Sequence, residues 1–254
     1  MILLDTNALI SILLIFLRVF AFVFMVPFFG TFFMPNFVRI YFSLAIAFSV
    51  FLWGDVEPVA VTSTLQLLGM ALQEVLFGFF AGFFLRLLFD AIFVAGEVIA
   101  IHTGLGFLMM FLPQQPQTTV LAGFSTLMGS TLFLSLGGAE VVYTGLVRSL
   151  ESLPPGSFDP YALNGKVFLS LFYESFSFGV KVALPVLIAS LLTNIILAVV
   201  NRFIPQINVF MVGLPLQIIV GLTVLMLSLP LIGLVLVSHM REYMLDFLRF
   251  IASS

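Results

Sequence analysis

The sequence predicts an all-α integral membrane protein, and composition carries that prediction. Of its 254 residues, 62% are hydrophobic and only 8% are charged, whereas a soluble domain carries about 25% charged residues. The mean hydropathy is +1.26. Apolar runs of helical length recur along the chain, separated by short turns rich in Pro, Gly and polar residues. This pattern is typical of membrane-associated helices.

Charge and cysteine content exclude several classes of function. The net charge is −3, and the nine basic residues form no basic run. Such a surface does not suit nucleic acid, so we expect no nucleic-acid partner. The chain has no Cys, which excludes disulfides, thiolate metal sites and cysteine nucleophiles.

The first two predicted helices cover residues 8–29 and 37–53. Polar residues 5–7 offer side-chain caps for the first helix, and Pro27 ends or kinks it. Pro35 marks the following turn. The second helix is a little short for a perpendicular span of the bilayer.

The third predicted helix, residues 65–102, is too long for a simple span. Its 38 residues would reach about 57 Å, well beyond the ~30 Å hydrocarbon layer. We therefore expect either a bend near Gly78 or Gly96, or a helix that lies partly outside lipid. A further apolar run covers residues 120–136.

The second half of the chain begins with its one extended polar stretch, residues 137–165. Within it, residues 141–153 predict a short amphipathic helix. Residues 167–200 and 209–237 are two further long apolar helices, and residues 239–254 predict an amphipathic tail. Together these apolar runs predict four to six membrane spans.

Residues 107–112 form an apolar hexamer that is far too short to cross a bilayer. Gly104 and Gly106 loosen the backbone before it, while Pro113 and Pro116 prevent a regular helix after it. Irregular backbone at membrane depth is tolerated only where protein buries it or where it borders an aqueous cavity. The segment is either a plug that closes a passage or a re-entrant or interfacial turn that only packs. The side chains of the plug would be Phe107, Leu108, Met109, Met110, Phe111 and Leu112.

Ionisable residues interrupt the apolar helices at eight positions: Arg18, Arg39, Glu74, Arg86, Asp90, Glu97, Glu174 and Lys181. Each costs at least ~2.5–3.5 kcal/mol on insertion, so each should be paired or face inward. Arg86 and Asp90 are four residues apart and share a helix face, and Glu174 and Lys181 are seven apart. The set is either an ion or proton path or a group of buried ion pairs between helices or subunits. Its scattered placement favours the ion pairs.

No motif predicts an enzyme or a cofactor. The chain has no Gly-x-Ser-x-Gly and no His-Glu-x-x-His, and only two His. His102 is expected to be a helix-end residue rather than a base. No His, Asp and Glu set has metal-ligand spacing, so we expect no metal site.

Several residues and short motifs resemble those of a known family. They are Arg18, Pro27, Gly30, Pro35, Arg39, Glu74, Gly78, Gly82, Gly96, Glu97, Gly104, the turn Asn-Arg-Phe-Ile-Pro-Gln-Ile-Asn-Val-Phe at 201–210 and Gly-Leu-Pro at 213–215. The turn, between two hydrophobic runs, is the most specific of them. On these residues the chain resembles the FliR/SctT family, the export-gate subunits of bacterial type III secretion systems.

The resemblance implies a fold and a set of partners. The fold would be one export-gate domain of long, tilted and kinked helical hairpins rather than a regular six-span bundle. Residues 1–165 would be FliP-like, with a plug loop at 104–119, and residues 166–254 would form a FliQ-like hairpin and the tail. Partners would be FliP, FliQ and FlhB, membrane lipid and unfolded flagellar export substrates, in the bacterial inner membrane within the flagellar basal body. Contacts with partners would involve Arg202, Pro205, Gln206 and Asn208.

The alternative is a stand-alone small-molecule transporter or channel. Such a protein commonly shows an internal inverted repeat, and none is evident in this sequence.

Overall fold

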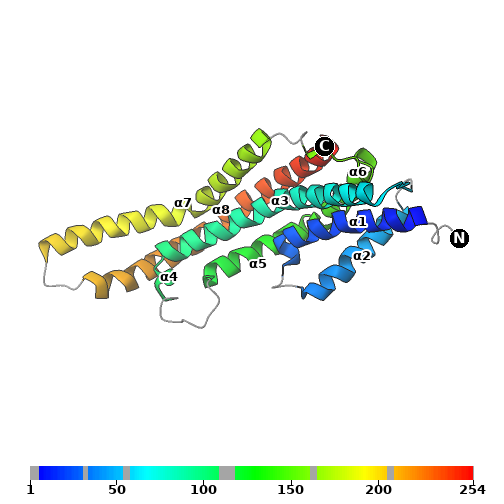
Figure 1. Ribbon diagram of the computed structural model, residues 1–254. Helices are drawn as coiled ribbons and strands as arrows, with labels where there is room; N and C mark the ends of the chain where they lie inside the picture. Colours follow the sequence, from blue (N-terminus) through cyan, green and yellow to red (C-terminus); the bar gives the residue numbers. More distant parts are fainter. Residues whose placement is uncertain are drawn as a thin grey trace. The chain divides into compact units, whose positions relative to one another are not determined.

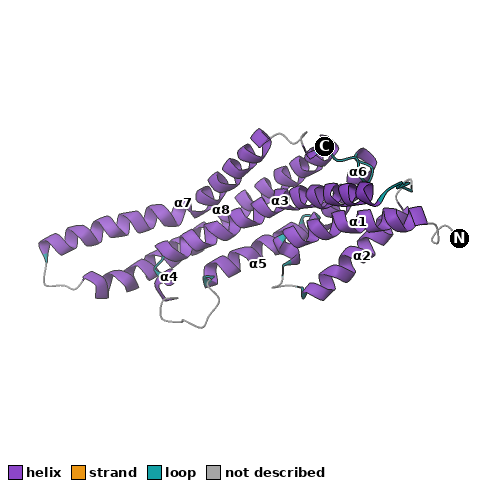
Figure 2. Cartoon of the chain, in the orientation of Figure 1, coloured by secondary structure: helices purple, strands orange, loops and turns teal. Residues whose placement is uncertain are grey.

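The structure is a computed structural model, and it describes residues 6–30, 34–53, 58–108, 118–160, 165–204 and 209–253. Every regular element in these ranges is a helix (Figures 1 and 2). In chain order the elements are α1 (Thr6–Met25), the 3₁₀ turn η2 (Pro27–Phe29), α2 (Asn36–Trp53), α3 (Thr64–His102), α4 (Leu105–Leu108), α5 (Val120–Ser135), α6 (Gly138–Ser152), α7 (Gly165–Phe203) and α8 (Val209–Ser253). The all-α prediction is confirmed.

Three helices are much longer than a bilayer is thick. α3 and α7 have 39 residues each and α8 has 45, or about 58 Å and 68 Å at 1.5 Å per residue. Four described helices are long and apolar enough to cross a membrane, or up to five if the bent pair α5 and α6 is one span. This number lies within the predicted four to six.

The predicted tail at 239–254 is not a separate element. It is the last part of α8, which runs without a break from Val209 to Ser253. No Gly or Pro lies between the apolar run and the tail, so the sequence contains no signal that would end the helix there. The amphipathic character is confirmed: Met240, Met244, Phe247 and Ile251 are buried, while Arg241, Glu242, Asp246 and Arg249 are exposed.

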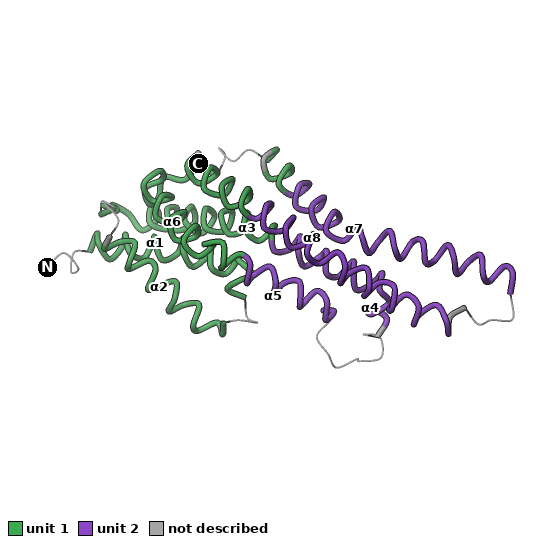
Figure 3. The backbone as a smooth tube through the Cα atoms, turned by 180° about the vertical axis from the view of Figure 1, so that it is seen from behind, with its two compact units in different colours: residues 1–88, 133–171, 241–254 green, residues 89–132, 172–240 purple. Residues whose placement is uncertain are grey.

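The chain divides into two compact units, each made of several segments (Figure 3). Unit 1 contains residues 1–88, 133–171 and 241–254, and unit 2 contains residues 89–132 and 172–240. Helices α3, α7 and α8 contribute residues to both units. The division predicted between residues 165 and 166 is of another kind, because it separates a FliP-like part from a FliQ-like part by resemblance. It stays a prediction.

Aromatic rings form much of the core of unit 1. The Phe84 ring lies 4.9 Å from Tyr243, 5.3 Å from Phe250 and 5.8 Å from Phe247, measured between ring centroids. The Tyr243 hydroxyl donates a hydrogen bond of 2.8 Å to the Phe84 carbonyl. The last turns of α8 are thus fixed on α3 by packing and by a buried hydrogen bond.

Glycines let helices approach closely in both units. A Cβ on Gly78 of α3 would overlap the carbonyl oxygen of Arg18 in α1, and one on Gly82 would lie 2.8 Å from the Phe22 carbonyl. In unit 2, a Cβ on Gly179 would lie 2.7 Å from the Ala91 carbonyl. Small residues at such contacts are the usual means of tight helix packing in membranes.

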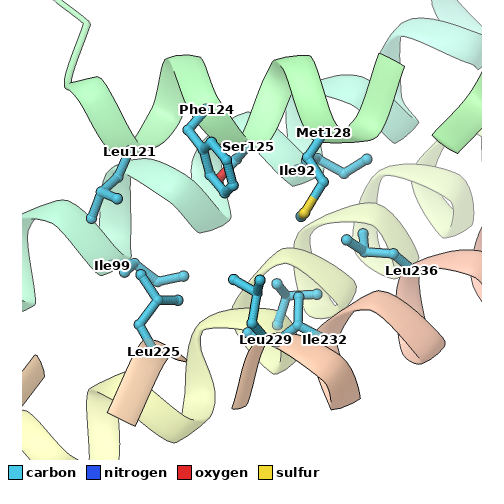
Figure 4. Close-up of a pocket in the computed structure, with 11 residues that line it drawn as sticks. Ile92, Ile99, Leu121, Phe124, Ser125, Met128, Leu225, Leu229, Ile232 and Leu236 are labelled. Carbon is cyan, nitrogen blue, oxygen red and sulfur yellow. The ribbon is translucent and has the colours of Figure 1, made fainter. Parts of the chain in front are cut away.

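Unit 2 contains a small apolar cavity among α3, α5, α7 and α8, with a volume of about 20 Å³. Figure 4 shows Ile92 and Ile99 on one side, with Leu225 and Leu229 opposite. Ser125 supplies a polar group to the lining. The space is large enough for one water, but its lining supplies too few polar partners to order it, so it is a packing gap.

Candidate functional site: the base of the 104–119 segment

The first end of the 104–119 segment is a tight turn. α3 ends at His102, as predicted for that residue. The backbone N–H of Thr103 bonds to the Ile99 carbonyl at 2.9 Å and that of Gly104 to the Ile101 carbonyl at 3.1 Å. Gly104 has φ of +75°, a conformation that favours glycine after a helix.

This turn packs against α8. A Cβ on Gly104 would lie 3.3 Å from the Leu214 side chain, and one on Gly221 would lie 2.6 Å from the Thr103 side chain. Gly106 lies within α4, where an added Cβ would come 3.3 Å from the Ile101 Cα. Glycine therefore permits both the reversal of the chain and its contact with α8.

The other end of the segment is held by a carboxylate. Half-buried Glu97 of α3 accepts a hydrogen bond of 3.0 Å from the backbone N–H of Thr119. The Thr119 hydroxyl in turn accepts from the N–H of Ala122 at 3.2 Å, which caps the start of α5. Both ends of the segment are thus fixed at the carboxyl end of α3, one by the turn that follows His102 and the other by Glu97.

The residues of the predicted seal, and the two prolines predicted to follow it as hinges, divide into two groups. Phe107 is 39% exposed and Leu108 is the last residue of α4. The others lie outside the described residues: Met109, Met110, Phe111, Leu112, Pro113 and Pro116.

A fully buried ion pair joins Arg18 and Glu74 in unit 1. The guanidinium donates to the two carboxylate oxygens at 2.5 Å and 3.0 Å. It also donates to the carbonyls of Ser149 at 2.8 Å and Leu153 at 3.0 Å, and Glu74 accepts from the Gly156 N–H at 2.7 Å. We call these five residues the Arg18–Glu74 cluster. It joins α1, α3, α6 and the loop that follows α6.

Arg39 is also buried, and its partner is the backbone. Its Nε donates to the carbonyl of Phe29, and its guanidinium carbon lies 5.0 Å from the centroid of the Phe24 ring. Arg39 thereby fixes the start of α2 on the turn that follows α1.

Three other predicted charges are exposed. Arg86 of α3 is exposed, whereas Asp90, one turn later, is half-buried. Glu174 and Lys181 of α7 are both exposed. Arg202, predicted to contact partners, is exposed near the end of α7, whereas Pro205, Gln206 and Asn208 lie outside the described ranges.

The sequence reasoning missed a second polar group near the base of the segment. The Ser190 hydroxyl lies 3.4 Å from Nδ1 of His102, and the Gln217 amide donates to Asn194. His102 and Asn194 also line an open cavity of about 230 Å³ on unit 2. Asn194 is conspicuous within the apolar run 183–200, and this isolated amide was the available signal.

The polar groups of the site make structural contacts between packed helices. In the described part of the chain, no three side chains among His, Asp and Glu could hold a metal ion. At the base of the segment, Glu97 bonds to the Thr119 backbone, His102 lies against Ser190, and Gln217 bonds to Asn194, all within unit 2. Such an arrangement can fix a segment between apolar helices.

The long apolar helices and the glycine-packed base define an all-helical membrane protein. Its class follows from comparison with known sequences: the chain belongs to the bacterial export proteins, family 1, whose model matches residues 9–243.

Curated relatives cover nearly the whole chain. It is 51% identical over 245 residues to the flagellar biosynthetic protein FliR of Aquifex aeolicus, which covers 96% of this chain and 95% of that protein. It is 33% identical over 233 residues to the protein of the same name from Caulobacter vibrioides, covering 90% and 92% of the two chains. For the Escherichia coli protein of that name the identity is 31% over 221 residues, covering 85% and 83%. The resemblance to the FliR/SctT family is confirmed.

Proposed function

We propose that this chain is a non-enzymatic subunit of the flagellar type III protein export gate in the bacterial inner membrane. The observation that carries the proposal is the 51% identity, over nearly the full length of both chains, to a protein named flagellar biosynthetic protein FliR. Membership of a family of export proteins agrees with it.

The exposed surface supports a role inside an assembly. Large apolar side chains are exposed along α7 and α8, among them Leu191 at 62%, Met226 at 76% and Leu227 at 78%. A surface of this kind needs lipid or protein cover. We propose FliP, FliQ and FlhB as the partners, with unfolded flagellar substrates passing through the assembly.

We further propose that the 104–119 segment closes the passage. Its two ends are fixed on one stretch of α3, by the Gly104 turn and by the bond between Glu97 and Thr119. Between these fixed ends the sequence places the apolar hexamer 107–112. A fixed base with an apolar loop is suited to sealing an aqueous passage without adding a membrane span.

The test compares two variants in cells: deletion of residues 107–112, and their replacement by six Gly and Ser residues. Both should admit small ions through assembled complexes, measured as membrane conductance, while affinity purification still recovers the partners. The replacement keeps the loop length, so it separates loss of the apolar seal from shortening of the loop.

Two results would count against the proposal. Ion-tight membranes that contain assembled variant complexes would refute the plug. A chain that purifies alone in mild detergent, monodisperse and without partners, would refute the export-gate subunit and favour the stand-alone transporter.

A further inference from the structure

The two ends of the 104–119 segment are attached to unit 2 by different kinds of contact. At the second end, the Glu97 carboxylate bonds to the Thr119 backbone. The helices at this end also pack closely, because a Cβ on Gly96 of α3 would lie 2.7 Å from the Ala122 Cα of α5. A charge-assisted hydrogen bond and close backbone packing together tie α5 to α3.

The first end is attached by van der Waals contacts with α8. A Cβ on Gly221 would lie 2.6 Å from the Thr103 side chain. A Cβ on Gly104 would lie 3.3 Å from the Leu214 side chain. The Thr103 hydroxyl bonds to its own helix, 3.1 Å from the Ala100 carbonyl. The fit of this turn against α8 therefore holds the first end.

The part of α8 in this contact is less firmly supported than α3. Pro215 lies within it, and because proline has no backbone N–H, the Met211 carbonyl receives no helical hydrogen bond. In the most apolar part of each helix, 17% of α8 residues are buried, compared with 61% of α3 residues. The Gln217 amide bonds to Asn194 of α7, so α8 is joined to α7 at this level.

The part of α7 that bonds to α8 follows a proline. Before that proline, a Cβ on Gly179 would lie 2.7 Å from a carbonyl of α3, so the two helices pack closely. Pro185 then interrupts the hydrogen bonds of α7. Beyond it, the Ser190 hydroxyl lies 3.4 Å from the His102 ring of α3, which is long for a hydrogen bond. Because helices bend at proline, the last part of α7 and the first part of α8 can move together away from α3.

We propose that the contact between the Thr103–Gly104 turn and α8 is the one that parts when the segment opens. The Glu97 end stays attached to α3 and α5. Leu214, Ile218 and Gly221, whose backbone or side chains contact the turn, thus form a clamp that holds the closed state. We call these three residues the α8 clamp. The inference rests on the proposed function, since it requires that the 104–119 segment closes a passage.

A reversible cross-link tests whether the contact parts. The chain has no Cys, so Thr103→Cys combined with Gly221→Cys introduces a single pair. A Cβ on Gly221 would lie 3.0 Å from the Thr103 Cβ, about 0.5 Å closer than the shortest usual Cβ spacing in a disulfide. A small shift therefore allows the bond. In cells that secrete flagellar substrates, oxidation of this pair should stop secretion, and reduction should restore it.

The matched control joins two helices that stay together in the proposed motion. Ile92→Cys combined with Gly129→Cys links α3 to α5, where a Cβ on Gly129 would lie 3.0 Å from the Ile92 side chain. Oxidation of this pair should leave secretion unchanged. Mass spectrometry of the purified chain shows, for each pair, whether the disulfide has formed.

A packing variant tests the same contact without a cross-link. Gly221→Ala places a methyl group against Thr103, and overpacking of this kind shifts an equilibrium about fivefold to a hundredfold. Assembled complexes should therefore conduct small ions about fivefold or more above the unmodified chain. Adding Thr103→Ala removes the nearest atom, the Cγ2 at 2.6 Å, and should reverse part of the rise. Gly233→Ala, in the same helix with nothing within 4 Å, should conduct like the unmodified chain.

Several results would overturn the inference. Full secretion through complexes that contain the disulfide between positions 103 and 221 would show that the contact does not part. Failure of that disulfide to form on oxidation would show that the turn does not touch α8. An equal loss of secretion from the control pair, or ion-tight complexes with Gly221→Ala, would also contradict the clamp. Failure of the proposed function looks different, because deletion of residues 107–112 would then leave membranes ion-tight and the unmodified chain would recover no partners.

Discussion

Removal of the Glu74 carboxylate should destabilise unit 1 more than any change to an exposed charge. Arg18 and Glu74 both have side chains that are 0% exposed, so Glu74→Ala leaves a buried guanidinium without its counter-charge. Breaking a buried ion pair in this way costs about 3–5 kcal/mol. The Gly156 N–H loses its acceptor as well, which adds about 1–3 kcal/mol. The expected loss is about 4–8 kcal/mol.

Thermal unfolding measures this loss. At roughly 2–4 °C per kcal/mol for a chain of this size, Glu74→Ala should lower the Tm by at least about 8 °C. The assay is the loss of the monodisperse peak of a fluorescent fusion in mild detergent as temperature rises. The control is Asp246→Ala, which breaks the exposed pair with Arg249 at 2.9 Å and should cost at most about 1 kcal/mol.

A charge swap decides whether the ion pair or the whole Arg18–Glu74 cluster matters. Arg18→Glu combined with Glu74→Arg keeps the pair but points a carboxylate at the carbonyls of Ser149 and Leu153, which accept hydrogen bonds and donate none. We therefore expect the swap to be no more stable than Glu74→Ala. A swap within about 2 °C of the unmodified chain, or a Glu74→Ala shift that small, would refute this reasoning.

Three further outcomes are expected. Gly78→Ala should destabilise the chain by about 1–3 kcal/mol because its Cβ meets a carbonyl of α1, whereas Gly69→Ala in the same helix, with nothing within 4 Å, should be neutral or stabilising. Thermal unfolding distinguishes the two, and equal Tm values would contradict the close approach. Glu97→Ala should speed amide hydrogen exchange at Thr119 about tenfold to a hundredfold through loss of a charge-assisted bond of about 1.5–3 kcal/mol. Glu97→Gln should retain most of the protection, and unchanged exchange in the Ala variant would exclude the bond. Tyr243→Phe should cost about 0.5–1.5 kcal/mol by removing the buried hydrogen bond from the hydroxyl to a carbonyl of α3, and a Tm equal to that of the unmodified chain would contradict it.

Local signals predicted the helices well. The apolar runs, with Pro, Gly and polar turns between them, predicted α3 as residues 65–102, and the structure gives Thr64–His102. Each of these signals acts on the backbone within a few residues, so it can be recognised in the sequence without knowing which helices pack together. The wrong boundary in α8 came instead from the change from apolar to amphipathic pattern, which occurs with no break in the helix.

Partners of buried polar groups could not be predicted. Spacing within a helix identifies neighbours three, four or seven residues away, whereas Arg18 meets Glu74 at a separation of 56 residues and Ser149 at 131. Glu97 shows the same limit, since its contact with Thr119 lies beyond the turn after α3. The sequence located these charges, and only the packing of separate helices brings each to its partner.

The composition of unit 1 has a consequence for biogenesis. Arg18 enters the membrane early, but the Gly156 N–H that completes its cluster is 138 residues further along the chain, and at ~5–20 residues per second a ribosome needs about 7–28 s to reach it. Phe247, which packs on Phe22 and Phe84, is made later still. Unit 1 therefore cannot mature in step with translation. Its first helix gains a counter-charge only after Glu74, 56 residues further along, has been made, and gains its aromatic partner only after Phe247 has been made.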